Sequence, residues 1–317
     1  MSTRRHFLFA LAAARAAAAE TEQAPEFRGV FPIMQTPYTE AGAVDFDVLA
    51  KETRWLAGTG THGMVWPQLA SEYMRLTFEE RMQGMTTIVE AGRDLRPKIV
   101  LGVQADDAAT AVRYAEHAQR LQSDAIIALP PRQGEQQDLD AVTEYYVAVG
   151  QASDRPLFIQ AIGEMPVEYI LELAEKVPTL RFVKDEAGHT LSRISEFRAT
   201  AGAPGIFTGG HGRTLIDEMA RGSQGNMPAA SWVDLYASCW DLWHEGREGE
   251  AIDIFSKALL YITQAQAYGL ASLSYVLHLR GVFKNWQVRN PKQRPLDAAA
   301  QDALRRTYEF VRPYLRA

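Results

Sequence analysis

The sequence predicts an α/β protein: a (β/α)8 TIM barrel with a C-terminal helical extension. Two observations lead to this prediction. Short apolar runs alternate with longer amphipathic stretches eight times, and purely helical spacing follows them. The runs are continuously apolar, as in parallel strands that are covered on both faces. A doubly wound open sheet is the alternative, but no run leads into a GxGxxG motif or a phosphate-binding loop.

Eight runs are candidates for the barrel strands. They are residues 30–37, 62–68, 98–104, 124–131, 156–161, 180–186, 205–210 and 225–230. Helix-like stretches separate them, and one of these, residues 78–92, follows Thr77 with Glu80 three positions on, the spacing of a capping box. We therefore assign residues 27–230 to the barrel. Residues 231–317, with apolar residues at helical spacing, are expected to form the last barrel helix and a C-terminal helical bundle.

Residues 1–19 predict an export leader. Arg4 and Arg5 precede a short apolar stretch, and small residues end at Ala19 just before the acidic Glu20. The paired arginines fit the twin-arginine pattern of bacterial export, so a periplasmic location is expected. A disordered basic terminus is the alternative, and the apolar stretch is too short to span a bilayer.

The composition limits the classes of binding partner that we expect. The formal net charge is −6, and the leader holds three arginines and no acid, so the remainder is more acidic still. Such a body does not favour nucleic acid or an anionic membrane surface. The histidines show neither HxH nor HExxH spacing, so we expect no metal site, and no motif predicts a cofactor. The single cysteine, Cys239, excludes an internal disulfide.

Lys184 ends the sixth strand candidate, in the segment LRFVKDEAG. Catalytic groups of this fold sit at the C-terminal ends of the strands, where a partly desolvated lysine can attack a carbonyl carbon. A surface lysine paired with Asp185 or Glu186 is the other interpretation. The pattern alone leaves both open.

The segment FVKDEAGHTLSRI resembles the Schiff-base segment of the dihydrodipicolinate synthase and N-acetylneuraminate lyase family, and the resemblance extends from about residue 27 to 315. It implies a barrel with a helical C-terminal bundle and a homo-oligomer, a tetramer or dimer. It also implies a lyase that joins Lys184 to an α-keto acid such as pyruvate through an imine, for aldol cleavage, condensation or dehydration.

Several positions depart from the family pattern. Leu69 and Ala70 stand where the family has two threonines, and Gln133 stands where it has a tyrosine proton shuttle. A glutamine cannot donate and recover a proton near neutral pH. The arginine that synthases carry after the fifth strand has no counterpart in residues 160–166. These losses argue against a dihydrodipicolinate synthase, and a non-catalytic keto acid or sugar acid binding protein is the alternative function.

The candidate site follows from the strand ends and from the resemblance. Lys184 is the expected nucleophile. Glu72 is either a catalytic base or a structural carboxylate, and Arg132 either faces the substrate or lies exposed in its loop. The residues expected to bind substrate are Gln68, Ala70, Ser71, Arg132, Gln133, Gln160, Gly209 and His211.

The leader generates the first prediction. The mature protein should begin near Glu20, after the alanine run that ends at Ala19. N-terminal sequencing of the exported protein checks this, and recovery of the uncut chain in the cytoplasm would contradict it.

Overall fold

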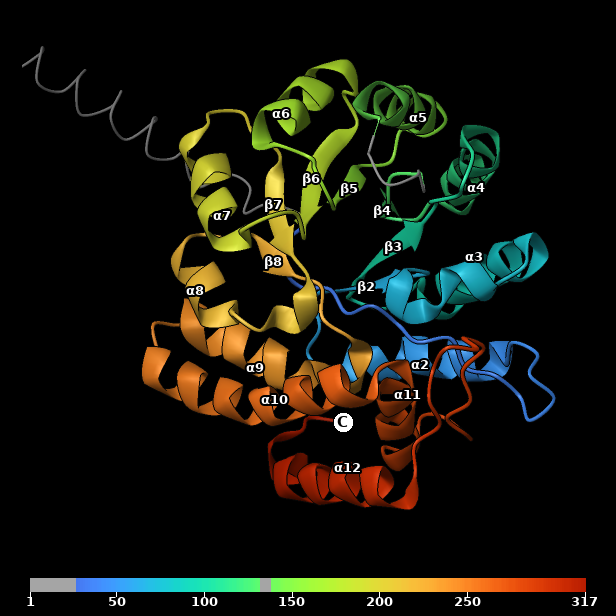
Figure 1. The fold of residues 1–317 in the computed structure, drawn as a ribbon, viewed down its shortest axis with the longest axis vertical. Helices are drawn as coiled ribbons and strands as arrows, with labels where there is room; N and C mark the ends of the chain where they lie inside the picture. Colours follow the sequence, from blue (N-terminus) through green and yellow to red (C-terminus); the bar gives the residue numbers. More distant parts are fainter. Residues whose placement is uncertain (1–26, 132–137) are drawn as a thin grey trace, which may run out of the picture.

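Eight parallel strands form the centre of the molecule (Figure 1). The structure is a computed structural model that describes residues 27–131 and 138–317, so the predicted leader, Arg132 and Gln133 lie outside the described residues. The strands are β1 (Gly29–Val30), β2 (Gly63–Trp66), β3 (Lys98–Gly102), β4 (Ala125–Ala128), β5 (Leu157–Ala161), β6 (Leu180–Asp185), β7 (Gly205–Thr208) and β8 (Gly225–Asn226). From β2 to β8 each strand pairs with the next along the chain, and β1 pairs with β8.

The segment that follows β1 brings the two ends of the sheet together. Ile33 bridges in parallel to Val65 of β2 on one side and to Ala229, just after β8, on the other. Met34 N donates to the Val65 carbonyl at 3.0 Å, and Val65 N donates to the Pro32 carbonyl at 2.9 Å. The sheet is therefore a nearly closed barrel. The predicted (β/α)8 fold is confirmed, and the open doubly wound sheet is wrong.

Helices surround the strands. They are α2 (Phe46–Gly58), α3 (Phe78–Gly92), α4 (Ala108–Leu121), α5 (Leu139–Gln151), α6 (Val167–Lys176), α7 (Thr190–Ala199) and α8 (Leu215–Ala220). The predicted capping box is present at α3: Thr77 Oγ1 accepts from Glu80 N at 3.1 Å, and Glu80 Oε2 accepts from Thr77 N at 2.9 Å. Two of the first turn's unpaired donors are satisfied in this way.

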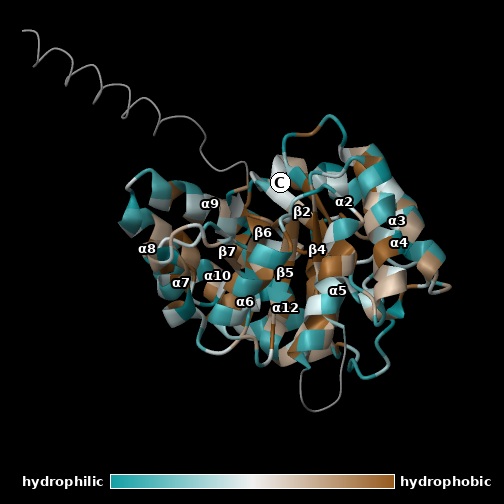
Figure 2. Ribbon diagram, turned by 90° about the horizontal axis from the view of Figure 1, so that it is seen from above, coloured by the Kyte–Doolittle hydropathy of each residue, from teal (hydrophilic) through white to brown (hydrophobic). Residues whose placement is uncertain are grey.

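Apolar side chains pack on both faces of the strands, which explains why the strand sequences are continuously apolar. Figure 2 shows the central strands coloured as hydrophobic. Inside the barrel, Phe158 stacks on Phe182 at 4.4 Å between ring centroids, and Phe207 meets Phe158 edge to face at 5.2 Å. The larger cluster lies between the outer faces of the strands and the helices. This packing fixes the strand ends, and with them the side chains at the mouth of the barrel.

Four helices follow the last strand and gather on one side of the barrel (Figure 1): α9 (Val233–His244), α10 (Glu248–Tyr268), α11 (Leu270–Leu279) and α12 (Ala298–Val311). A buried ion pair ties the chain after α11 to α9, because Arg280 Nη1 lies 2.6 Å from Asp234 Oδ2 and both side chains are at most 1% exposed. The other oxygen of Asp234 accepts the backbone N–H groups of Arg316 and Ala317. No helix within the described ranges is long and apolar enough to cross a membrane.

Asp234 generates a stability prediction. Asp234→Ala should lower the free energy of unfolding by about 3–5 kcal/mol, because it leaves the buried Arg280 guanidinium without its counter-charge. Urea denaturation followed by circular dichroism measures this. Glu250→Ala, which breaks the exposed Arg247–Glu250 pair, is the matched control and should leave the midpoint unchanged. Equal midpoints for the two variants would contradict the argument.

Candidate active site

Lys184 lies at the C-terminal end of β6, inside the mouth of the barrel. Its strand neighbours are Gln160 on β5 and Phe207 on β7. The residue is 5% exposed, so it does not extend to the surface as the alternative interpretation required. Its ammonium group lies 3.5 Å from Glu186 Oε2. A buried amine beside a carboxylate is therefore the central feature of the site.

Sequence reasoning did not assign Glu186 to the site. Its Oε1 accepts the Gly210 N–H at 2.7 Å, and its Oε2 accepts the side-chain amide of Gln160. Burial raises the pKa of this carboxyl, but the Lys184 charge and the two hydrogen bonds lower it more, so the net pKa lies below its ordinary value. Glu186 is therefore an ionised carboxylate held on three sides.

Gly209 makes room for this pair. A Cβ at position 209 would overlap the Glu186 carboxylate and would come within 2.8 Å of Lys184 Cε. Gly209 thus lies beside the lysine, where the sequence placed it, and the absence of a side chain there is a steric requirement. Gln160 also belongs to the site, but its amide reaches Lys184 through Glu186.

A cavity of about 400 Å³ opens over Lys184. Of the residues that the sequence predicted, it brings together Lys184, Gln68, Ala70 and His211. The rest of its lining is Ile33, Leu69, Met74, Glu186, Gly210, Met227, Ala229, Leu270 and Asn290. The lining therefore combines apolar side chains with three ionisable ones, those of Lys184, Glu186 and His211.

His211 lies in a tight turn of the cavity wall, with φ at 60°. Its backbone carbonyl accepts the Tyr236 hydroxyl at 2.7 Å, which fixes the turn. Burial lowers the pKa of the imidazole, Glu186 raises it, and Arg213 and Lys184 lower it further, for a net decrease. The ring is therefore neutral at pH 7.

Hydrogen bonds within the loop after β2, and from this loop to Met34, fix its conformation. Ser71 is fully buried: its hydroxyl donates to the Met34 carbonyl at 2.5 Å and accepts from Gln68 N at 3.0 Å. The Ser71 and Glu72 N–H groups donate to the carbonyls of Gln68 and Leu69, both at 3.0 Å. These two N–H groups are thus not free to bind a substrate carboxylate, although Ser71 was among the residues expected to bind substrate. Ser71 shapes the loop from behind, while Gln68 and Ala70 face the cavity.

Glu72 does not line the cavity over Lys184. Its carboxylate accepts the backbone N–H groups of Arg289 at 3.1 Å and Asn290 at 2.6 Å. Of the two interpretations of this residue, the observed contacts are those of the structural carboxylate. Its bonds position Asn290, which lines the cavity.

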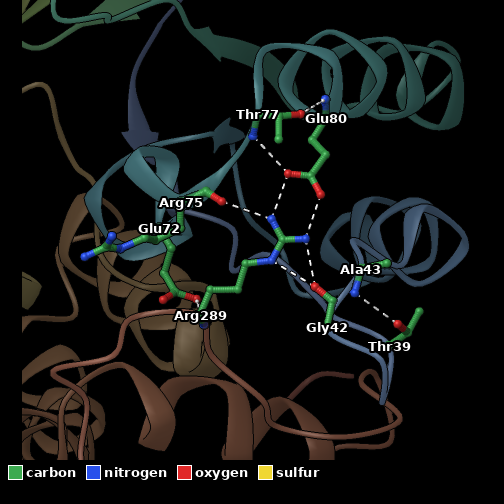
Figure 3. A network of polar contacts seen from close by, with 8 residues as sticks. All are labelled: Thr39, Gly42, Ala43, Glu72, Arg75, Thr77, Glu80 and Arg289. Carbon is green, nitrogen blue, oxygen red and sulfur yellow. Dashed lines mark hydrogen bonds and ion pairs between the residues drawn. The ribbon is translucent and has the colours of Figure 1, made fainter.

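Arg289 anchors the loop that carries Asn290 (Figure 3). Its guanidinium forms two hydrogen bonds to the Glu80 carboxylate, at 2.6 and 2.7 Å, and donates to the Gly42 and Arg75 carbonyls. The loop between α11 and α12 is thereby fastened to the barrel. Asn290 also lines a second cavity, of about 770 Å³, so the two cavities adjoin at this residue.

The structure adds lining residues that sequence reasoning missed, among them Glu186, Leu270 and Asn290. For Glu186 the available signal was a second acid directly after the Lys184-Asp185 pair. Asn290 and Leu270 lie in helical-extension sequence that carries no motif. Among the residues that the structure describes, no three His, Cys, Asp or Glu side chains are grouped so that they could hold a metal ion.

Known proteins are similar to this chain in sequence and in fold. The model of the dihydrodipicolinate synthetase family matches residues 26–310. The 4-hydroxy-tetrahydrodipicolinate synthase of Rhizobium meliloti (strain 1021) is 26% identical over 288 residues, 88% of this chain and 96% of that protein. The L-2-keto-3-deoxyarabonate dehydratase of Azospirillum brasilense is 23% identical over 276 residues, 84% of this chain and 89% of that protein.

A solved structure shows the same fold. The N-acetylneuraminate lyase of Mycoplasma synoviae superposes with a TM-score of 0.80 at 18% identity, covering 90% of this chain and 99% of that one. The family model spans most of the chain, and the fold agrees with it. The chain therefore belongs to the dihydrodipicolinate synthetase family, a family of class I aldolase-type lyases.

Proposed function

We propose that this protein is a lyase that forms an imine between Lys184 and an α-keto acid. The observation that carries the proposal is the 5% exposed Lys184, which lies at a strand end, within a cavity and 3.5 Å from a carboxylate. An imine converts the keto carbon into an electron sink, so that a neighbouring bond can break without a free carbanion. Burying an amine is costly, and this site retains one where a carbonyl substrate can reach it.

The reaction that fits the site is aldol cleavage, condensation or dehydration, and not the synthase reaction. Leu69 and Ala70 offer no hydroxyl group to a substrate carboxylate, and residues 160–166 contain no arginine for a second carboxylate. The relative named as an L-2-keto-3-deoxyarabonate dehydratase supports a keto acid with a polar tail as substrate. The adjoining cavity beyond Asn290 offers space for such a tail.

Export through the N-terminal leader and assembly into a tetramer or dimer stay predictions of the sequence. The leader lies outside the described residues, and a single chain is described.

Lys184→Ala tests the proposed imine. Borohydride reduction of the wild-type protein with pyruvate should give a stable adduct at Lys184, which mass analysis of the peptides locates. The variant should give none and should lose turnover, because no other lysine lines the described part of the cavity. Lys176→Ala removes an exposed lysine on α6 and should keep the adduct. Wild-type protein without an adduct from any small keto acid would contradict the proposal and favour a non-catalytic binding protein.

Arg289→Ala tests the role of the anchored loop. Loss of the paired hydrogen bonds to Glu80 should release Asn290 from the cavity wall. We expect the keto acid concentration for half-maximal trapping to rise about tenfold, which corresponds to about 1.4 kcal/mol of binding free energy. Arg312→Ala, in an exposed ion pair with Glu309, is the control. Unchanged half-saturation in Arg289→Ala would show that the loop does not contribute to binding.

A further inference from the structure

Imine chemistry at Lys184 requires a group that accepts and returns protons. The family places a tyrosine for this task where this chain has Gln133, and a glutamine side chain has no proton to exchange near neutral pH. Glu72, the base considered from the sequence, is engaged by two backbone N–H groups and does not line the cavity. The proton-transfer group must therefore be sought among the ionisable side chains of the cavity wall.

In the described part of the wall, these side chains are Lys184, Glu186 and His211. Lys184 is consumed by the imine. His211 is neutral and lies in a turn that the hydrogen bond from Tyr236 to its carbonyl holds in place. Glu186 lies between the amine and the N-terminal end of that turn, where it accepts the Gly210 N–H. Glu186 alone of the two remaining groups is in direct contact with the reacting nitrogen, at 3.5 Å.

We propose that the Glu186 carboxylate is the acid–base group of the reaction, an assignment that rests on the proposed imine at Lys184. The carboxylate takes a proton from the lysine ammonium, and the neutral amine adds to the keto carbon. A proton moves from nitrogen to oxygen, and the carboxylic acid then protonates the hydroxyl, which leaves as water. This gives a protonated imine and restores the carboxylate. The carboxylate next takes a proton from the adjacent carbon, which yields the enamine.

The position of Glu186 suits both transfers. The adjacent carbon is two bonds from the lysine nitrogen, so a carboxylate that contacts the nitrogen is also close to that carbon. The Gly210 N–H and the Gln160 amide hold one oxygen each, and every carboxylate oxygen keeps a further lone pair for a proton. The missing side chain at Gly209 leaves room for the carboxylate beside the lysine chain. The group is thus oriented before substrate arrives, as efficient proton transfer requires.

Exchange of the pyruvate methyl protons in D2O, followed by NMR, isolates this step. Exchange requires the imine and then the removal of a proton from carbon, and no second substrate is needed. Glu186→Gln keeps the size of the side chain and removes its basicity. It should slow exchange by a factor of about 10² to 10⁴, while prolonged borohydride trapping still labels Lys184. Glu196→Gln, on the exposed face of α7, should behave like the wild type in both assays.

The two assays separate the outcomes. If wild-type protein gives no adduct, the proposed function fails and this inference falls with it. If Glu186→Gln is trapped but exchanges as fast as the wild type, the function stands and Glu186 is not the base. Adduct formation also shows that a variant is folded. If Glu186→Gln gives no adduct, the test uses Glu186→Ala with added formate instead. If formate restores exchange to Glu186→Ala, the assignment is supported, since a diffusing carboxylate does not replace a merely structural one. If Glu186→Ala still gives the adduct but formate does not restore exchange, the assignment is overturned.

Discussion

Burial of the Lys184 amine is the constraint on which the site depends. An ammonium group removed from water is strongly destabilising unless an opposite charge and hydrogen bonds compensate it. Glu186 provides the charge, and Gln160 and Gly210 then satisfy the oxygens of Glu186. Gly209 is required because this arrangement leaves no space for a Cβ. Three neighbouring strand ends, those of β5, β6 and β7, are thus matched to one another by the need to hold a single buried amine.

A second polar network fastens the C-terminal part of the chain to the same mouth. Glu80 serves twice, because it caps α3 through Thr77 and also binds the Arg289 guanidinium (Figure 3). The hydrogen bonds from Arg289 lower the pKa of Glu80 below its ordinary value, although burial acts against them. A depressed carboxyl pKa contributes stability that is present above the ordinary range and is lost as pH falls through the lowered value. The loop that places Asn290 therefore stays anchored at neutral pH.

The sequence predicted those features that local patterns determine. Continuous apolar runs indicated the parallel barrel, and the strand-end rule placed Lys184, Gln68 and His211 at one mouth. Contacts between segments that are distant in the sequence could not be predicted. The Glu72 carboxylate is engaged by backbone atoms 217 and 218 positions later, which no local pattern reveals. The contact of Glu186 with Gln160 likewise depends on the register of β5 against β6, so an acid two residues after Lys184 could not be told from a surface charge.

The apolar residues of the cavity lining affect the interaction between Lys184 and Glu186. Leu69 and Ala70 carry no hydroxyl group, and together with Met74, Met227 and Leu270 they give the cavity lining an apolar part beside its charged part. An apolar wall lowers the local dielectric, which strengthens the attraction between Lys184 and Glu186 and raises the cost of leaving either unpaired. In the proposed reaction, a protonated Glu186 accompanies the neutral lysine amine, and an ionised Glu186 balances the charge of the cationic imine. The apolar part of the lining therefore couples the charge states of the two residues, so that a proton given up by one is most readily held by the other.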